Sequence, residues 1–105
     1  MALTITDANF QDQVADQDKL VIMDFWATWC QPCRAIAPII DQLHEELDGK
    51  AIVGKVNIEE NSELPVKYKV RGIPTVVFVK NGEEVGRQVG LASKAAFDQK
   101  IAALL

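Results

Sequence analysis

Residues 24–34 read Asp24-Phe25-Trp26-Ala27-Thr28-Trp29-Cys30-Gln31-Pro32-Cys33-Arg34 and join the end of an apolar segment to the expected start of a helix. They contain both cysteines of the chain, separated by two residues. Two thiols at this spacing can close a small disulfide ring, and a thiol at a helix N-terminus meets free backbone N–H groups and the positive end of the helix dipole. Both effects favour the thiolate of Cys30, which is the form that attacks a disulfide. The pattern therefore indicates thiol–disulfide exchange.

The two cysteines are expected to differ in role. Cys30 lies at the helix start, where a partner can reach it, and is the predicted nucleophile. Cys33 lies inside the first turn and is predicted to resolve the mixed disulfide by attacking Cys30. A structural zinc site needs four ligands, whereas the chain offers two cysteines and a single histidine, His44, so no metal is expected. An inert structural disulfide is disfavoured because the first twenty residues show no secretion signal.

The segment before the cysteines, residues 20–27, is apolar on both alternating faces except at Asp24. This pattern is typical of a central strand covered by helices on each side, as in a parallel α/β sheet. The alternative is a solvated carboxylate at a strand edge, but the segment has no polar face to support it. Burial should raise the pKa of Asp24 within reach of the site. We therefore predict that Asp24 accepts a proton from Cys33.

The residues after the cysteines form an amphipathic helical pattern. Apolar side chains recur at helical spacing up to Leu47, with acidic residues on the opposite face. Pro38 lies inside this helix and is expected to kink it, and Gly49 is placed to end it. Residues 51–57 follow as a strand, and Ser62 is predicted to cap a short helix.

The N-terminal part adds two smaller elements. Residues 3–5 alternate like a short edge strand, and Thr6 or Asp7 is predicted to cap a helix that buries Phe10 and Val14. No internal repeat or linker divides the chain. The 105 residues are therefore expected to form a single domain, 1–105.

The last third of the chain predicts a hairpin and a helix. Residues 75–80 form a strand pattern, and Asn81-Gly82 is a strong two-residue hairpin signal that leads into residues 83–89. Ser93 is predicted to cap a terminal helix with an apolar inner face.

The composition is ordinary for a globular protein, with 49% hydrophobic and 25% charged residues. The net charge is −4, and no run of Lys or Arg is interleaved with aromatic residues, so a nucleic-acid partner is not expected. The longest apolar runs are too short to span a bilayer, so no membrane partner is expected. The first twenty residues contain neither a basic n-region nor an apolar h-region, which predicts a cytoplasmic location.

Further motifs accompany the cysteine pair. They are Gly72-Ile73-Pro74-Thr75, about forty residues after it, Asn81-Gly82 and Val89-Gly90. A lone Cys-x-x-Cys is a weak signal, but Trp-Cys-x-Pro-Cys followed by Ile-Pro-Thr is a strong one. Read together, these motifs closely resemble the thioredoxin family. The resemblance covers Leu3 to Leu105 and implies an α/β thioredoxin fold, a five-stranded mixed sheet flanked by four helices, with a cis peptide bond before Pro74.

The same resemblance implies how the site works. In the family, the residue matching Asp24 accepts the proton and the lysine matching Lys55 lies near it and tunes it. The Cys30–Cys33 disulfide is the redox group, and no cofactor motif is present, so no cofactor is expected. The implied partners are proteins that contain disulfides and a thioredoxin-reductase-type electron donor, and the chain itself is expected to be a monomer. The positions that match the family's apolar substrate platform are Trp29, Ile58, Gly72, Ile73, Pro74, Val89, Gly90 and Leu91.

The chain departs from the family between the two cysteines. Thioredoxins usually carry Gly-Pro there, where this chain has Gln31-Pro32, so we expect these two residues to tune the redox potential. The sequence leaves two alternatives open, an oxidant or isomerase with the same fold, and a binding module that uses the apolar platform. The favoured prediction is a protein-disulfide reductase that works by exchange at Cys30 and Cys33.

Overall fold

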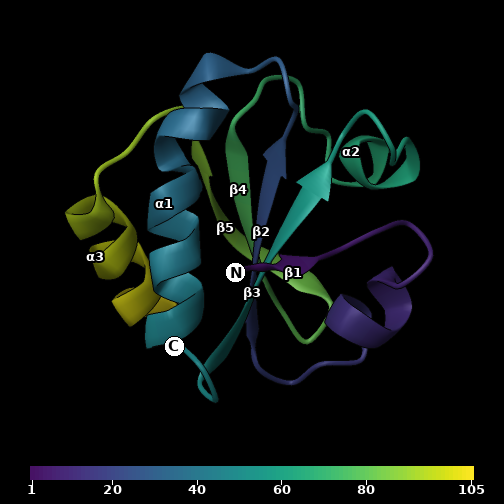
Figure 1. Cartoon of the computed structure of the whole chain (residues 1–105). Helices are drawn as coiled ribbons and strands as arrows, with labels where there is room; N and C mark the ends of the chain where they lie inside the picture. The colour runs from purple at the N-terminus through teal and green to yellow at the C-terminus, as the bar shows by residue number, and fades with distance from the viewer.

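Helices cover both faces of a single mixed β-sheet in the computed structural model, which describes all residues, Met1–Leu105 (Figure 1). The strands are β1 (Leu3–Thr4), β2 (Leu20–Trp26), β3 (Ala51–Asn57), β4 (Thr75–Lys80) and β5 (Glu83–Val89). The helices are a short π-helix, η1 (Gln11–Ala15), and the α-helices α1 (Gln31–Glu46), α2 (Glu63–Lys67) and α3 (Lys94–Leu104). These five strands and four helices confirm the predicted α/β architecture.

The strand order brings the ends of three strands to one edge of the sheet. The order is β1-β3-β2-β4-β5, in which β1, β3 and β2 are parallel and β4 and β5 are antiparallel to their neighbours. Because β4 runs opposite to β2, its first residue, Thr75, lies beside Phe25 near the end of β2. Thr75 also lies beside Val89 at the end of β5. The segments that carry the predicted site residues therefore meet at the upper end of the sheet in Figure 1, where β2 leads into α1.

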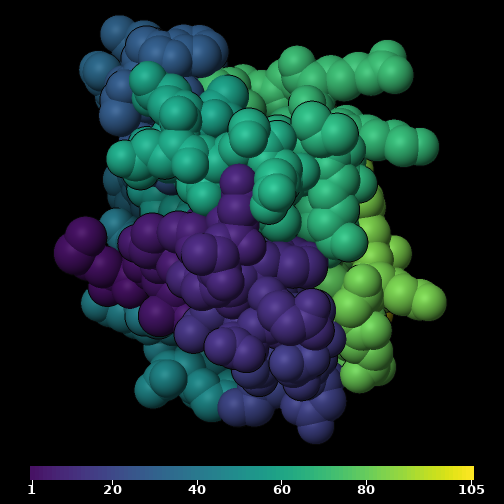
Figure 2. All heavy atoms as spheres, turned by 90° about the vertical axis from the view of Figure 1, so that its right-hand side faces the viewer, coloured from purple at the N-terminus to yellow at the C-terminus, as the bar shows by residue number.

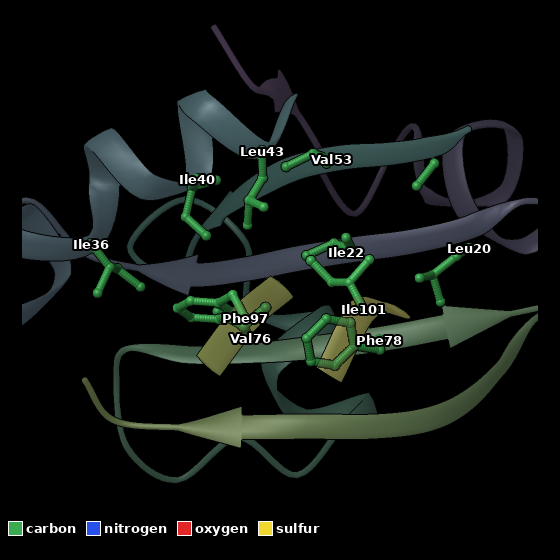
Figure 3. Close-up of a cluster of buried hydrophobic side chains, with 11 residues drawn as sticks. Leu20, Ile22, Ile36, Ile40, Leu43, Val53, Val76, Phe78, Phe97 and Ile101 are labelled. Atoms are coloured by element: carbon green, nitrogen blue, oxygen red, sulfur yellow. The ribbon is translucent and has the colours of Figure 1, made fainter. Parts of the chain in front are cut away.

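The two faces of β2 belong to two separate apolar clusters. Leu20 and Ile22 lie in the cluster with α1 and α3, whereas Val21, Met23 and Phe25 lie in the cluster with η1 and α2. Figure 3 shows the first cluster, in which side chains from β2, β3 and β4 meet those of α1 and α3. This arrangement confirms the prediction of a central strand covered by helices on each side.

The second cluster lies beneath the N-terminal segment, η1 and α2. Figure 2 shows this side of the molecule, where the N-terminal segment, in purple, packs below the teal and green segment that contains α2. Val14 of η1 is fully buried in the cluster, and Phe10 packs against it from a half-buried position. The predicted helix at this place therefore buries the side chains expected of it.

The β4–β5 hairpin has the predicted turn. Asn81 and Gly82 have φ values of 53° and 80°, and positive φ at both central residues is what a two-residue type I′ turn requires. The register between the two strands shifts between Phe78 and Val79, an irregularity that the sequence did not predict.

The connections on either side of α1 differ slightly from the prediction. β2 ends at Trp26, so Ala27 already belongs to the loop that leads to the cysteines. α1 continues through Pro38 to Glu46, and the following turn contains Gly49 with φ +84°, a conformation that favours glycine.

Of the three predicted helix caps, Ser93 makes its capping hydrogen bond, to a backbone N–H in the first turn of α3. Thr6 caps the helical turn that leads into η1, because its hydroxyl accepts a hydrogen bond from the backbone N–H of Asn9 at 3.0 Å. Ser62 is the N-cap residue of α2, but its hydroxyl makes no capping bond, so this prediction was wrong.

Asp7 caps α2 instead of η1. Its carboxylate accepts hydrogen bonds from the backbone N–H groups of Glu63 at 3.2 Å and Leu64 at 3.0 Å. Both N–H groups belong to the first turn of α2, which has no intrahelical acceptor for them. The prediction failed because the cap comes from a residue 57 positions away from Leu64, and local sequence patterns do not show such pairs.

Candidate active site

Cys30 is the N-cap residue of α1, the helix that begins at the upper end of the sheet in Figure 1. Its Sγ accepts a hydrogen bond from the backbone N–H of Cys33 at 3.2 Å, and the two cysteines form a disulfide across the first turn. Pro32 lies in that turn, where a missing N–H costs nothing because these groups have no intrahelical partner. In the dithiol form, the same Cys33 amide and the helix dipole stabilise a thiolate at Cys30.

Both sulfur-bearing residues are nearly covered. Cys30 is 4% exposed and Cys33 is 2% exposed, a smaller contrast than the sequence led us to expect. Ala27 is buried with them, and the half-buried Ile58 and Ile73 pack against this cluster. Access to Cys30 therefore depends on the surface beside it rather than on a protruding thiol.

The loop between β2 and α1 is held by hydrogen bonds on two sides. Glu59, in the connection between β3 and α2, accepts bonds from the N–H and the hydroxyl of Thr28 at 2.9 and 2.8 Å. The guanidinium of Arg34 donates to the backbone carbonyl of Thr28 at 2.7 Å. The bonds from Thr28 lower the pKa of Glu59. Sequence reasoning missed Glu59, because nothing in the local pattern connects residue 59 with residue 28.

Asp24 is fully buried on the face of β2 that carries Leu20 and Ile22 and points toward α1. Neither of its carboxylate oxygens has a hydrogen-bond partner. Burial raises the pKa of Asp24 from 3.8 to about 7, while the positive charge of Lys55 opposes the rise and the negative charge of Asp41 adds to it. This agrees with the expectation from the sequence. A carboxyl group with a pKa near 7 can take up and release a proton at neutral pH.

Lys55 lies next to Asp24 in the sheet, as its partner in the parallel register of β2 and β3. Its ammonium is 4.5 Å from the centroid of the Trp26 ring, a cation–π contact, and it forms no ion pair with Asp24. Lys55, Trp26 and Asp41 line an open pocket of about 400 Å³. Lys55 therefore acts on Asp24 through its charge, from a position set by the tryptophan ring.

A groove of about 300 Å³ opens beside the cysteines. Ile58 and Ile73 belong both to its lining and to the cluster around the disulfide, so the groove adjoins the redox pair. Two further predicted substrate residues, Trp29 and Gly72, also line it, and Trp29 is 64% exposed. Sequence reasoning missed the remaining lining residues, which are Pro65, Val70 and Arg71.

The other predicted substrate residues lie around Pro74, outside the groove lining. The Ile73-Pro74 bond is cis, as the resemblance implied, and the N–H of Gly90 donates to the carbonyl of Pro74 at 2.9 Å. This bond ties the end of β5 to the start of β4. Val89 and Leu91, on either side of Gly90, are 62% and 60% exposed. Large apolar side chains thus remain on the surface at the edge of the sheet that carries the cysteines.

Comparison with known proteins agrees with this geometry. The sequence profile of the thioredoxin family matches residues 1–103. The chain belongs to the thioredoxin family. It is 48% identical over 94 residues to the thioredoxin of Rickettsia bellii, with 90% of each chain covered. It is 44% identical over 96 residues to the thioredoxin of Chlorobaculum thiosulfatiphilum, covering 91% of this chain and 89% of the relative. Thioredoxin 1 of Nostoc sp. is 40% identical over 100 residues, covering 95% and 94%.

Membership of the thioredoxin family, expected from the sequence motifs, and the thioredoxin fold are therefore confirmed. Thioredoxins are protein-disulfide oxidoreductases, and the Cys30–Cys33 disulfide supplies the redox pair that this activity needs. The chain is accordingly a thiol–disulfide oxidoreductase. Gln31 and Pro32, the pair that departs from the usual thioredoxin motif, are both exposed in the first turn of α1, next to Cys30.

Thioredoxins need no cofactor, and the structure brings no three His, Cys, Asp or Glu side chains together where they would hold a metal ion. His44, considered above as a zinc ligand, lies in the last turn of α1, eleven residues after Cys33 and about 16 Å away along the helix axis. None of the helices is both long enough and apolar enough to cross a membrane.

Proposed function

We propose that this thioredoxin-family protein acts as a reductant of protein disulfides, with Cys30 as the nucleophile and Cys33 as the resolving thiol. The position of Cys30 carries the proposal. It is the N-cap of α1, its sulfur accepts the Cys33 N–H, and an apolar groove opens beside it. This position favours a thiolate and lets an extended segment of another protein approach it.

The proposed reaction has two exchange steps. The Cys30 thiolate attacks one sulfur of the substrate disulfide, so that a mixed disulfide forms and the other substrate sulfur leaves as a thiolate. Cys33 then loses its proton and attacks Cys30 Sγ, which closes the Cys30–Cys33 disulfide and releases the second substrate sulfur. The substrate takes up two electrons and two protons, and the protein is left in the disulfide form. A thioredoxin-reductase-type donor restores the dithiol.

Asp24 is proposed as the acceptor of the Cys33 proton, directly or through a water molecule. Its burial on the α1 side of the sheet and its pKa of about 7 support this role. Lys55 favours the ionised carboxylate, which is the form that accepts a proton. Together they would keep a base available in a part of the protein that is otherwise apolar.

The substrate is proposed to bind as an added strand across the apolar platform. The backbone N–H and C=O of Ile73 form no hydrogen bond within the chain, so they are available to an extended peptide. Trp29, Val89 and Leu91 offer exposed apolar surface on either side. Backbone pairing of this kind accepts many sequences, which suits a reductant with many protein substrates.

The remaining parts of the proposal rest on the sequence and on the family resemblance. They are a thioredoxin-reductase-type partner, a monomeric single domain of residues 1–105, tuning of the potential by Gln31 and Pro32, and a cytoplasmic location. Gel filtration over a range of concentrations would test the monomeric state.

Trapping of the mixed disulfide tests the assignment of the two thiols. Reduced Cys33→Ser protein, incubated with a disulfide-containing protein, should accumulate a covalent complex, because the first step can occur and the second cannot. The Cys30→Ser variant should accumulate far less. Non-reducing electrophoresis and mass spectrometry measure both. A complex that forms mainly with the Cys30→Ser variant would reverse the roles.

The double variant Cys30→Ser, Cys33→Ser is the matched control for the binding alternative. It keeps the groove and the apolar platform but has no thiol. If it still performs the protein's role in cells, the platform serves to bind a partner and the exchange reaction is incidental.

A further inference from the structure

Arg71 is the one charged side chain in the lining of the groove beside the cysteines. The two other arginines are occupied, since the guanidinium groups of Arg34 and Arg87 donate hydrogen bonds to backbone carbonyls. Arg71 donates none and takes part in no ion pair. It is exposed, so its five N–H donors are free to bind a ligand.

The charge of the surrounding segment has the same sign. Between Leu64 and Gly82 the charged residues are Lys67, Lys69, Arg71 and Lys80, with no Asp or Glu, in a chain whose net charge is −4. Lys67 is directed away, over the rings of Phe10 at 5.4 Å and Tyr68 at 5.9 Å. Arg71 is therefore the cation of this segment that lines the groove.

We propose that Arg71 makes this protein prefer disulfide substrates with an acidic residue close to the attacked cysteine. The inference rests on the function proposed above and names the substrate class of the same site. A guanidinium can bind a carboxylate through two parallel hydrogen bonds, which a neutral or basic side chain cannot accept in that way. The occupant of the groove is thus an extended segment that carries an apolar side chain and a neighbouring carboxylate.

The shared lining limits where that carboxylate can lie. Arg71 and Ile73 are two residues apart in sequence and both line the groove. A peptide that pairs with the backbone of Ile73 therefore places residues close to its cysteine, on one side of it, near Arg71. The volume of the groove, about 300 Å³, is at the lower limit for small-molecule pockets, and the groove is open to solvent. It therefore suits single side chains of a peptide better than a whole small molecule.

The test uses disulfide-linked peptide dimers that differ at a single position, two residues before or two residues after the cysteine. That position is Asp, Asn or Lys. Reduced protein, without reductase, is mixed with each peptide in a single turnover, and the second-order rate constant is divided by that of dithiothreitol with the same peptide. The division removes the effect of the substitution on the intrinsic reactivity of the peptide.

For one of the two positions, we expect the Asp peptide to react about threefold faster than the Asn peptide at low salt, because exposed ion pairs contribute modestly. The ratio should fall as the ionic strength rises. Arg71→Gln should bring the ratio to about one, Arg71→Lys should keep part of it, and Arg71→Glu should favour the Lys peptide. Lys50→Gln is the matched control, since Lys50 is exposed at the opposite end of β3 from the cysteines, and it should keep the ratio.

Equal rates for the Asp and Asn peptides at both positions would overturn the proposal, and so would a preference that survives in Arg71→Gln. Neither result would affect the proposed reductase function, since the peptides would still be reduced. If the protein reduces none of the peptides, the proposed function itself fails, and the preference fails with it.

Discussion

Asp24 and Phe25 are neighbours in the central strand and are both fully buried, but they lie on opposite faces of the sheet. Phe25 packs among apolar side chains and against the ring of Tyr68, with 6.3 Å between ring centroids. Asp24 faces α1 and has no hydrogen-bond partner. One face of the strand thus contributes only to packing. The other carries a carboxylate whose ionised form is destabilised by burial.

The stability lost by burying ionised Asp24 can be calculated from its pKa. One pKa unit corresponds to about 1.4 kcal/mol, so a rise from 3.8 to about 7 corresponds to about 4 kcal/mol of lost stability when the group is ionised. That is a large share of the stability of a small domain. This loss of stability is consistent with the proposed role of Asp24 in proton transfer and gives it no role in stabilising the fold.

Phe25→Ala should have the largest effect on stability. Removing a fully buried aromatic side chain leaves a cavity, and the free energy of unfolding should fall by about 3–5 kcal/mol. The loss should be the same at pH 5 and pH 8, because no charge is involved. Chemical denaturation at the two pH values measures it. A loss below about 1 kcal/mol would show that the two faces do not differ in the way described.

Asp24→Asn should raise the free energy of unfolding, by an amount that depends on pH. The native pKa of Asp24 is raised, so the wild type has no penalty below about pH 4 and loses stability as the pH rises through about 7. The variant lacks this loss. It should match the wild type near pH 4 and exceed it by up to about 4 kcal/mol at pH 8. Denaturation curves from pH 4 to 8 measure the difference, and parallel curves for the two proteins would contradict the raised pKa.

Asp24→Ala should slow the reaction, in contrast to the gain in stability expected for Asp24→Asn. Resolution of the mixed disulfide by Cys33 should slow about tenfold or more, because a general base typically contributes at least this much. The first step, attack by Cys30, should slow less. In the wild type the rate of resolution should rise as the pH passes through about 7, and in the variant this rise should disappear. Rapid-mixing kinetics with a preformed mixed disulfide separate the two steps, and equal resolution rates would remove the proposed role of Asp24.

Asp7→Ala should have the smallest effect, and it should change stability alone, because Asp7 caps α2 on the face of the sheet that carries Phe25. Loss of the carboxylate that caps α2 should lower the free energy of unfolding by about 1 kcal/mol and leave the rates of disulfide exchange unchanged. Ser62→Ala is the control, because Ser62 makes no capping bond, and it should have almost no effect. A larger loss from Ser62→Ala than from Asp7→Ala would show that the cap is local after all.

The sequence predicted those parts of the molecule that short-range patterns specify. Residues 20–27 predicted the central strand because both of their faces are apolar, and the strand ends one residue earlier, at Trp26. Asn81-Gly82 predicted its turn because few residues accept positive φ. The motif around Cys30 predicted both the family and the chemistry. The raised pKa of Asp24 also followed from the pattern, since a carboxyl group inside an apolar strand has to be buried.

The features that sequence reasoning missed join distant segments. Asp7 caps a helix that begins more than fifty residues later, and Glu59 binds Thr28 across 31 positions. Arg71 is one exposed arginine among several basic residues until the fold places it in the groove. These contacts depend on how the strands are ordered in the sheet, which no local periodicity shows.

An equilibrium redox titration tests the central claim, that Cys30 and Cys33 form a reductant, most directly. The protein is equilibrated with defined thiol and disulfide buffers, and its oxidation is followed by tryptophan fluorescence, since Trp29 adjoins Cys30. We expect a midpoint more negative than the glutathione range of about −220 to −260 mV. A midpoint of about −120 to −180 mV, as in strong oxidants and isomerases, would contradict the claim and show that Gln31 has changed the direction of the chemistry.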